Sequence, residues 1–157
     1  TLLRFLSTAI AFEDQELMPR DRFIFYRMIL TLLNPSLALP QEAMAKVLEM
    51  HHVTYRVRVN RLKNRFSQTL TALEKGQRLT LDDTHQRLAE RLLRHFDHLY
   101  VTLLPYYEAS IEDLENNLEI NMLRSSNGFG GMLMHEQLDY SYPHVVDVRR
   151  LYHELKS

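Results

Sequence analysis

Cysteine is absent from this chain of 157 residues, and glycine and proline are scarce. Without cysteine the chain can form no disulfide, no thiol nucleophile and no thiolate zinc site. It therefore suits a reducing compartment, and we expect a cytoplasmic protein. Four glycines, five prolines and few alternating strand patterns predict an all-α fold. Since no run of about 18 apolar residues occurs, we expect no membrane partner.

What is present is the composition of an ordinary globular domain, with 45% hydrophobic and 25% charged residues. We predict a helical bundle with two parts: residues 1–78, which include a three-helix unit over 19–75, and residues 79–157, a helical half for dimerisation or partner docking. The chain begins Thr-Leu-Leu-Arg, without an initiator Met or the pattern of a signal peptide. We expect it to be a piece of something longer.

Apolar residues at helical spacing predict seven helices. The first should end at the acidic run 13–16, and the second at Asn34-Pro35. Asp82 or Asp83 should cap the fifth, and the glycine-rich stretch 125–131 should be a linker. The predicted helices are Leu2–Phe12, Pro19–Leu33, Gln41–Met50, Thr54 to the glycine at 76, 82 or 83 to about Leu104, Ser110–Leu123, and a last one opened by Tyr142-Pro143 with Val148, Leu151, Tyr152 and Leu155 inward.

The net charge of −1 hides a segregation of charge along the chain. Residues 40–78 hold eight Lys/Arg against three Glu, whereas residues 79–120 hold three Arg against nine Asp/Glu. A positive segment is typical of a surface that binds phosphate. It is equally typical of a surface that pairs with the acidic segment, within one molecule or between subunits.

The helix that begins near Thr54 has a polar and basic face opposite an apolar stripe. Valines from Val53 to Val59 alternate as in a strand, but the stripe continues at helical spacing to Leu73 and is too long for one. Arg and Asn pair with base edges, and flanking basic residues reach phosphates. The predicted nucleic-acid-binding residues are Thr54, Arg56, Arg58, Arg61, Lys63, Asn64 and Arg65.

Ten residues here stand in the order and spacing of a DNA-binding motif: Ala45, Leu48, Met50, Thr54, Arg56, Arg58, Val59, Arg61, Lys63 and Phe66. Through them, residues 39–66 resemble the helix-turn-helix of sigma-factor region four and of response-regulator output domains. Two positions depart from that pattern. Glu49 stands where glycine is frequent, and Tyr55 stands where a smaller aliphatic residue is usual.

The resemblance implies that residues 54–65 are the recognition segment and that Gln41–Met50 form the supporting helix. It implies a transcriptional regulator or DNA-associated factor, without enzyme activity or cofactor, whose partner is double-stranded DNA. Helix-turn-helix proteins commonly dimerise, so we expect a homodimer or a larger protein assembly.

Two other functions stay open. In the first, the chain is a helical adaptor of a multiprotein complex that binds no nucleic acid. In the second, Arg91 and His98 serve a helical ribonuclease, the histidine as general acid or base and the arginine as charge stabiliser. His85, His95 and His98 lie on one predicted helix. His95 with His98, and Glu49 with His52, have spacings that suit a metal ion, but we read all of these histidines as surface residues and predict no metal site.

Overall fold

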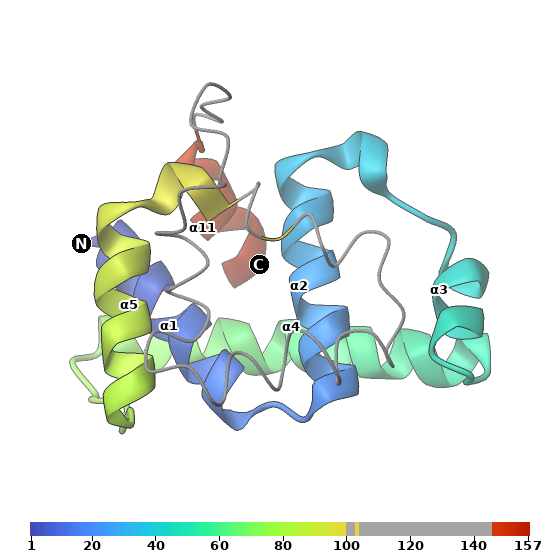
Figure 1. Cartoon of the computed structure of the whole chain (residues 1–157), viewed down its shortest axis with the longest axis horizontal. Helices are drawn as coiled ribbons and strands as arrows, with labels where there is room; N and C mark the ends of the chain where they lie inside the picture. Colours follow the sequence, from blue (N-terminus) through green and yellow to red (C-terminus); the bar gives the residue numbers. More distant parts are fainter. Residues whose placement is uncertain (100–102, 104–145) are drawn as a thin grey trace.

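The computed structural model describes residues 1–99, 103 and 146–157 (Figure 1). This part of the chain forms α helices and two short 3-10 helices and no strand, so the predicted all-α fold is confirmed. None of its helices is long and apolar enough to cross a bilayer. The elements are α1 (Leu2–Glu16), α2 (Pro19–Leu33), η1 (Pro35–Leu37), α3 (Gln41–Val47), α4 (His52–Glu74), α5 (Asp83–Arg94), η2 (Phe96–His98) and α11 (Val148–Lys156).

The bounds of α2 agree with the sequence prediction, because strong signals mark both ends. Pro19 occupies the first turn, where a proline costs no hydrogen bond, and Asn34 caps the other end before Pro35. The predicted end of α1 at Phe12 is wrong. The helix continues to Glu16, since Glu13 is buried and finds a partner inside the fold instead of standing in solvent.

The predicted start of α4 at Thr54 is wrong. The helix begins at His52, and the Nδ1 atom of His51 accepts the cap hydrogen bond from the backbone N–H of Val53 at 3.2 Å. Gly76 ends α4 as predicted, with a left-handed φ of 82°. The N–H of Gln77 reaches back to the carbonyl of Ala72 at 3.0 Å, which closes a Schellman turn.

Asp82 caps α5 as predicted, by accepting from the His85 N–H at 2.8 Å. The predicted continuation of α5 to Leu104 is wrong, because the helix ends at Arg94 and η2 follows. In α11 the inward positions Leu151, Tyr152 and Leu155 are confirmed, and Val148 is half-buried. Residues 110–123, 125–131 and 142–143, where we predicted a helix, a linker and a helix start, lie outside the described part.

Helix α4 is the element on which the others assemble. It contacts α1, α2, α3 and α11, while α5 runs beside α1 (Figure 1). The rings of Phe25 and Phe66 lie 5.1 Å apart, which joins α2 to α4. Buried residues of both predicted parts of the chain, such as Leu6, Leu88 and Leu151, belong to this one core.

Charged residues also lie in the interior, at the last turns of α1. The Asp14 carboxylate is 4% exposed and accepts a hydrogen bond from the Tyr26 hydroxyl at 2.9 Å. Its second oxygen lies 2.9 Å from Nε2 of His85, and the guanidinium of Arg22 stands 3.8 Å away. The side-chain amide of Gln15 binds the link between α4 and α5. It donates to the carbonyl of Thr80 at 2.9 Å and accepts from the N–H of Asp82 at 2.8 Å. The end of α1 is thus tied to α2 and to the start of α5.

His85, which we expected at the surface, is buried, because its imidazole bridges two carboxylates. Its Nε2 faces Asp14, and its Nδ1 lies 2.8 Å from the Asp82 carboxylate. Burial acts to lower the pKa of His85, but the hydrogen bonds and negative charges of the two aspartates outweigh it and raise that pKa above 6.5. The protonated ring therefore stabilises the contact between α1 and α5.

We predict that the stability of the protein falls as the pH rises above 6.5. The folded state binds the His85 proton more tightly than the unfolded chain does, so the contribution is fully present below the unfolded pKa of 6.5. It is lost as the pH rises through the folded pKa. The free energy of unfolding, measured in urea across neutral pH, should show this decline.

The variant His85→Gln should lose about 2–3 kcal/mol at acidic pH, because Asp14 then keeps fewer partners for a buried charge. Its stability should also lack the decline above pH 6.5. The exposed His153 of α11 provides the control, since His153→Gln should keep the wild-type pH profile. A decline that survives in His85→Gln would contradict this account.

Candidate nucleic-acid interface

The turn between α3 and α4 has the backbone conformation of a glycine turn, although it contains no glycine. Leu48 ends α3, and Glu49 adopts a left-handed φ of 54°. The N–H of Met50 bonds to the carbonyl of Ala45 at 3.0 Å, and that of Glu49 bonds to Lys46 at 3.1 Å. These two bonds define a Schellman motif, which sets the angle at which α4 leaves α3. At Glu49 the backbone thus adopts the left-handed conformation that favours glycine, although the side chain is a glutamate.

Apolar contacts hold α3 against α4 behind this turn. Ala45 and Leu48 are 3% and 0% exposed, so both residues belong to the buried side of this helix pair. Tyr55, Leu62 and Phe66 form the buried stripe of α4. The guanidinium of Arg20 in α2 donates to the carbonyl of Leu48, which fixes the turn from the other side.

The face of α4 opposite the stripe lies open to solvent. Six of the seven predicted nucleic-acid-binding residues are exposed: Thr54, Arg56, Arg61, Lys63, Asn64 and Arg65. Asn64 lies almost opposite Tyr55 on a helical wheel, and Arg61 is its neighbour one turn earlier. Within the described residues, no ion pair involves Arg56, Arg61 or Lys63.

Arg58 and Arg65 differ from the other basic residues of α4 because each has an internal partner. Arg58 is half-buried and lies 3.4 Å from the Asp21 carboxylate of α2. Arg65 is 42% exposed, and its Nε lies 3.0 Å from the Glu13 carboxylate, which is 1% exposed. These two arginines line one edge of α4 and hold it against α1 and α2.

Arg65 provides most of the interaction that offsets the cost of burying the Glu13 carboxylate. The Thr69 hydroxyl adds one weaker bond, at 3.4 Å. Burial raises the pKa of the Glu13 carboxyl, although the charge and hydrogen bond of Arg65 act to lower it. The ion-pair partners of Arg58 and Arg65 come from α2 and α1. Among the described residues, none comes from the acidic segment that begins at 79.

Exposed valines accompany the basic residues. Val53 and Val57 are 45% and 51% exposed and lie one turn apart on the outward face of α4. Val47, at the end of α3, is 44% exposed. An apolar side chain at such a place can contact a thymine methyl group in the major groove or a protein partner.

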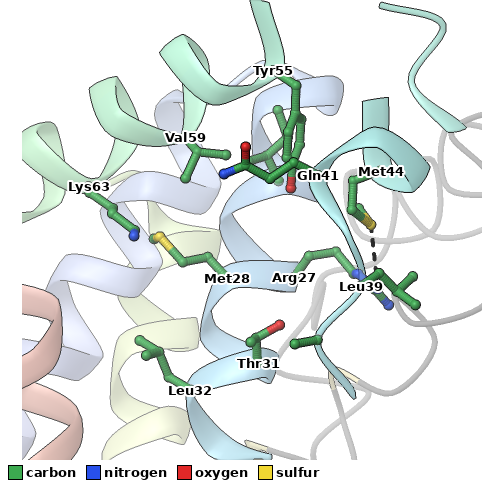
Figure 2. A pocket seen from close by; sticks show the side chains of 12 residues that line it. Arg27, Met28, Thr31, Leu32, Leu39, Gln41, Met44, Tyr55, Val59 and Lys63 are labelled. Carbon is green, nitrogen blue, oxygen red and sulfur yellow. Dashed lines mark hydrogen bonds between the residues drawn. The ribbon is translucent and has the colours of Figure 1, made fainter. Parts of the chain in front are cut away.

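A pocket of about 200 Å³ lies behind α4, between that helix, α2 and the segment that leads into α3 (Figure 2). Arg27 is 4% exposed, and its guanidinium donates to the Met44 sulfur at 3.5 Å. Burial raises the pKa of Tyr55 despite the opposing charge of Arg27. Lys63 extends over Met28 at the pocket edge, so of the exposed basic residues it is the one turned toward α2 (Figure 2).

The remaining candidate sites have little support in the described residues. There, no group of three His, Cys, Asp or Glu could hold a metal ion. The His51 ring stacks on His52, with centroids 4.4 Å apart. The side chain of His98 lies outside the description, and with it the Arg91–His98 pair of the ribonuclease hypothesis.

Sequence reasoning missed the buried carboxylates Glu13 and Asp14. A signal for Glu13 exists, because Leu6, Ile10, Glu13 and Leu17 are spaced four, three and four residues apart. Glu13 thus occupies a position of the apolar stripe. A buried acid at such a position requires a partner for its charge, and Arg65 is that partner.

We predict that Glu49→Gly stabilises the protein by about 0.5–1 kcal/mol, because glycine adopts the left-handed conformation without the steric cost of a Cβ atom. Glu49→Ala removes the same carboxylate but keeps the Cβ, so it should give no such gain. Urea unfolding of the two variants and the wild type measures the difference. Equal stability of the two variants would contradict a left-handed Glu49.

We predict that Arg65→Ala lowers the free energy of unfolding by about 1–2 kcal/mol, since it leaves the buried Glu13 carboxylate almost unpaired. The estimate stays below that for a fully buried pair because Arg65 is 42% exposed. Arg61→Ala is the matched control on the same helix and should change stability by less than about 0.5 kcal/mol. Equal losses in both variants would exclude the structural role of Arg65.

No family model, curated protein or solved structure matches the chain.

Proposed function

We propose that the protein binds double-stranded DNA, with α4 as the helix that enters the major groove and α3 as its support. The observation that carries the proposal is the outward face of α4. Arg61 and Asn64 are exposed there and Arg56 is exposed at its flank, and neither arginine has an ion-pair partner among the described residues. A guanidinium and an amide can each form two hydrogen bonds to a base edge, and a guanidinium can alternatively bind phosphate.

The turn before α4 supports the same proposal. A recognition helix must leave its supporting helix at a sharp, fixed angle. The Schellman motif at Glu49 and the bond from Arg20 to the Leu48 carbonyl provide such a fixed angle. The structure keeps this geometry with a glutamate where glycine is favoured, at a cost in backbone energy.

The proposal extends to regulation of transcription by two copies of the chain. Two recognition helices that meet successive major grooves must lie roughly 34 Å apart, a spacing that dimers of helix-turn-helix proteins provide. Thr54 and Lys63 flank the proposed contact, and Arg58 and Arg65 contribute charge while they hold the helix in place.

A second candidate function is a helical adaptor that docks on another protein. The exposed Val47, Val53 and Val57 favour it, because they place an apolar strip beside the basic residues. An acidic partner helix with apolar residues at helical spacing would complement both features. The first function predicts binding to duplex DNA, and the second predicts binding to a protein helix.

Fluorescence anisotropy with a random duplex at low and high salt tests the DNA proposal. We expect binding at low salt that weakens as salt increases, with a slope of about 0.9 per phosphate contact in a double-logarithmic plot. The double variant Arg56→Gln/Arg61→Gln should reduce that slope and weaken binding at least about tenfold while the fold stays intact.

The control carries the same change in charge elsewhere on the surface. Arg87→Gln/Arg149→Gln alters exposed arginines of α5 and α11 and should keep the wild-type affinity. Equal loss in the two double variants would mean that only net charge matters. No binding to duplex DNA at low salt would leave the adaptor as the better function.

A further inference from the structure

The side of α4 that points most directly away from the core is uncharged. It lies opposite the buried Tyr55, Leu62 and Phe66, and its residues follow one another at helical spacing: Val53, Val57, Asn60 and Asn64. All of them are exposed, the two valines at 45% and 51%. We call these residues, 53, 57, 60 and 64, the outer stripe.

Cations border the outer stripe on both sides. Arg56 and Lys63 are two helical turns apart and lie along one side, whereas Arg61 lies along the other. In the part of the chain that the structure describes, none of these three forms an ion pair. A helix in the major groove faces base edges in front and a phosphate backbone on either side. Uncharged residues between two rows of cations match that environment.

The side chains of the outer stripe match the edges of A·T base pairs. Adenine presents an acceptor and a donor in the major groove, and one asparagine amide can bind both. Thymine presents a methyl group, which an apolar side chain such as valine contacts. Guanine presents two acceptors instead, so the oxygen of an amide placed there would face an acceptor, and cytosine has no methyl group. Valine and asparagine are also short, which lets α4 approach the floor of a groove roughly 8.5 Å deep.

We propose that the outer stripe recognises A·T base pairs in the major groove. Asn60 and Asn64 bind adenine edges, and Val53 and Val57 contact thymine methyl groups. This inference rests on the proposed function, because it assigns the bases that the DNA-binding helix reads. The protein should therefore distinguish duplexes by base composition, and the thymine methyl group should contribute to affinity.

Competition by alternating duplexes tests this assignment. A fluorescent random duplex is bound at low salt and displaced by unlabelled poly(dA-dT), poly(dA-dU), poly(dG-dC) or poly(dI-dC). Poly(dA-dT) should compete best. Poly(dA-dU) lacks only the thymine methyl group and should compete about fourfold less well, the loss expected for one buried methyl group. Poly(dI-dC) has the G·C pattern in the major groove and the A·T pattern in the minor groove, so it should compete as weakly as poly(dG-dC).

Variants of the outer stripe connect the base preference to individual residues. Val57→Ala should reduce the difference between poly(dA-dT) and poly(dA-dU). Asn64→Ala should reduce the preference for poly(dA-dT) over poly(dG-dC) about fivefold or more. Neither residue is charged, so the salt dependence of binding should stay that of the wild type. Val47→Ala is the matched control, because Val47 is an equally exposed valine of α3 outside the outer stripe, and it should keep both preferences.

The possible results separate this inference from the proposed function. Equal competition by poly(dA-dT) and poly(dA-dU), or strong competition by poly(dI-dC), would overturn the inference, because the methyl group or the major groove would then play no part. Equal affinity for all four duplexes would exclude the base preference and leave DNA binding in place. Absence of binding to the random duplex at low salt would exclude the proposed function and this inference with it.

Discussion

The fold depends on the interaction of two adjacent buried carboxylates with three other helices. Glu13 binds Arg65 of α4, and Asp14 binds Tyr26 of α2 and His85 of α5. Buried charges are costly when unpaired, so the last turns of α1 are stable only when these helices stand in register. The apolar core supplies most of the driving force, but it would tolerate small shifts that these bonds forbid.

This constraint divides the basic residues of α4 into two groups with different tasks. Arg58 and Arg65 lie along the edge that faces α1 and α2, where Asp21 and Glu13 hold them. Those two pairs fix the rotation of α4 about its own axis. As a result Arg61 and Asn64 are held on the outward side of α4, with Arg56 at its flank. Such a fixed orientation is the preorganisation that the proposed interface would use.

Local signals in the sequence predicted much of the fold. Pro19 and Asn34-Pro35 gave both ends of α2, and Gly76 gave the end of α4, because each acts through its own backbone. The break after α5 was missed, since Leu99 and Leu103 continue the apolar spacing beyond it and are themselves buried. Of the candidate site, the outward face followed from helical periodicity. The pairing of Arg58 and Arg65 did not, because their partners lie 37 and 52 residues away in the sequence.

Helix α4 has 23 residues and is therefore roughly 34 Å long. Its first half carries the exposed basic face, and its last turn, at Leu73, borders a hollow of about 650 Å³ beside α1 and α5. The helix has no interior glycine or proline that would let it bend. The helix therefore moves as a rigid body. A tilt of about two degrees about one end moves the other end by about 1 Å, which is close to the change in donor–acceptor distance that breaks a hydrogen bond.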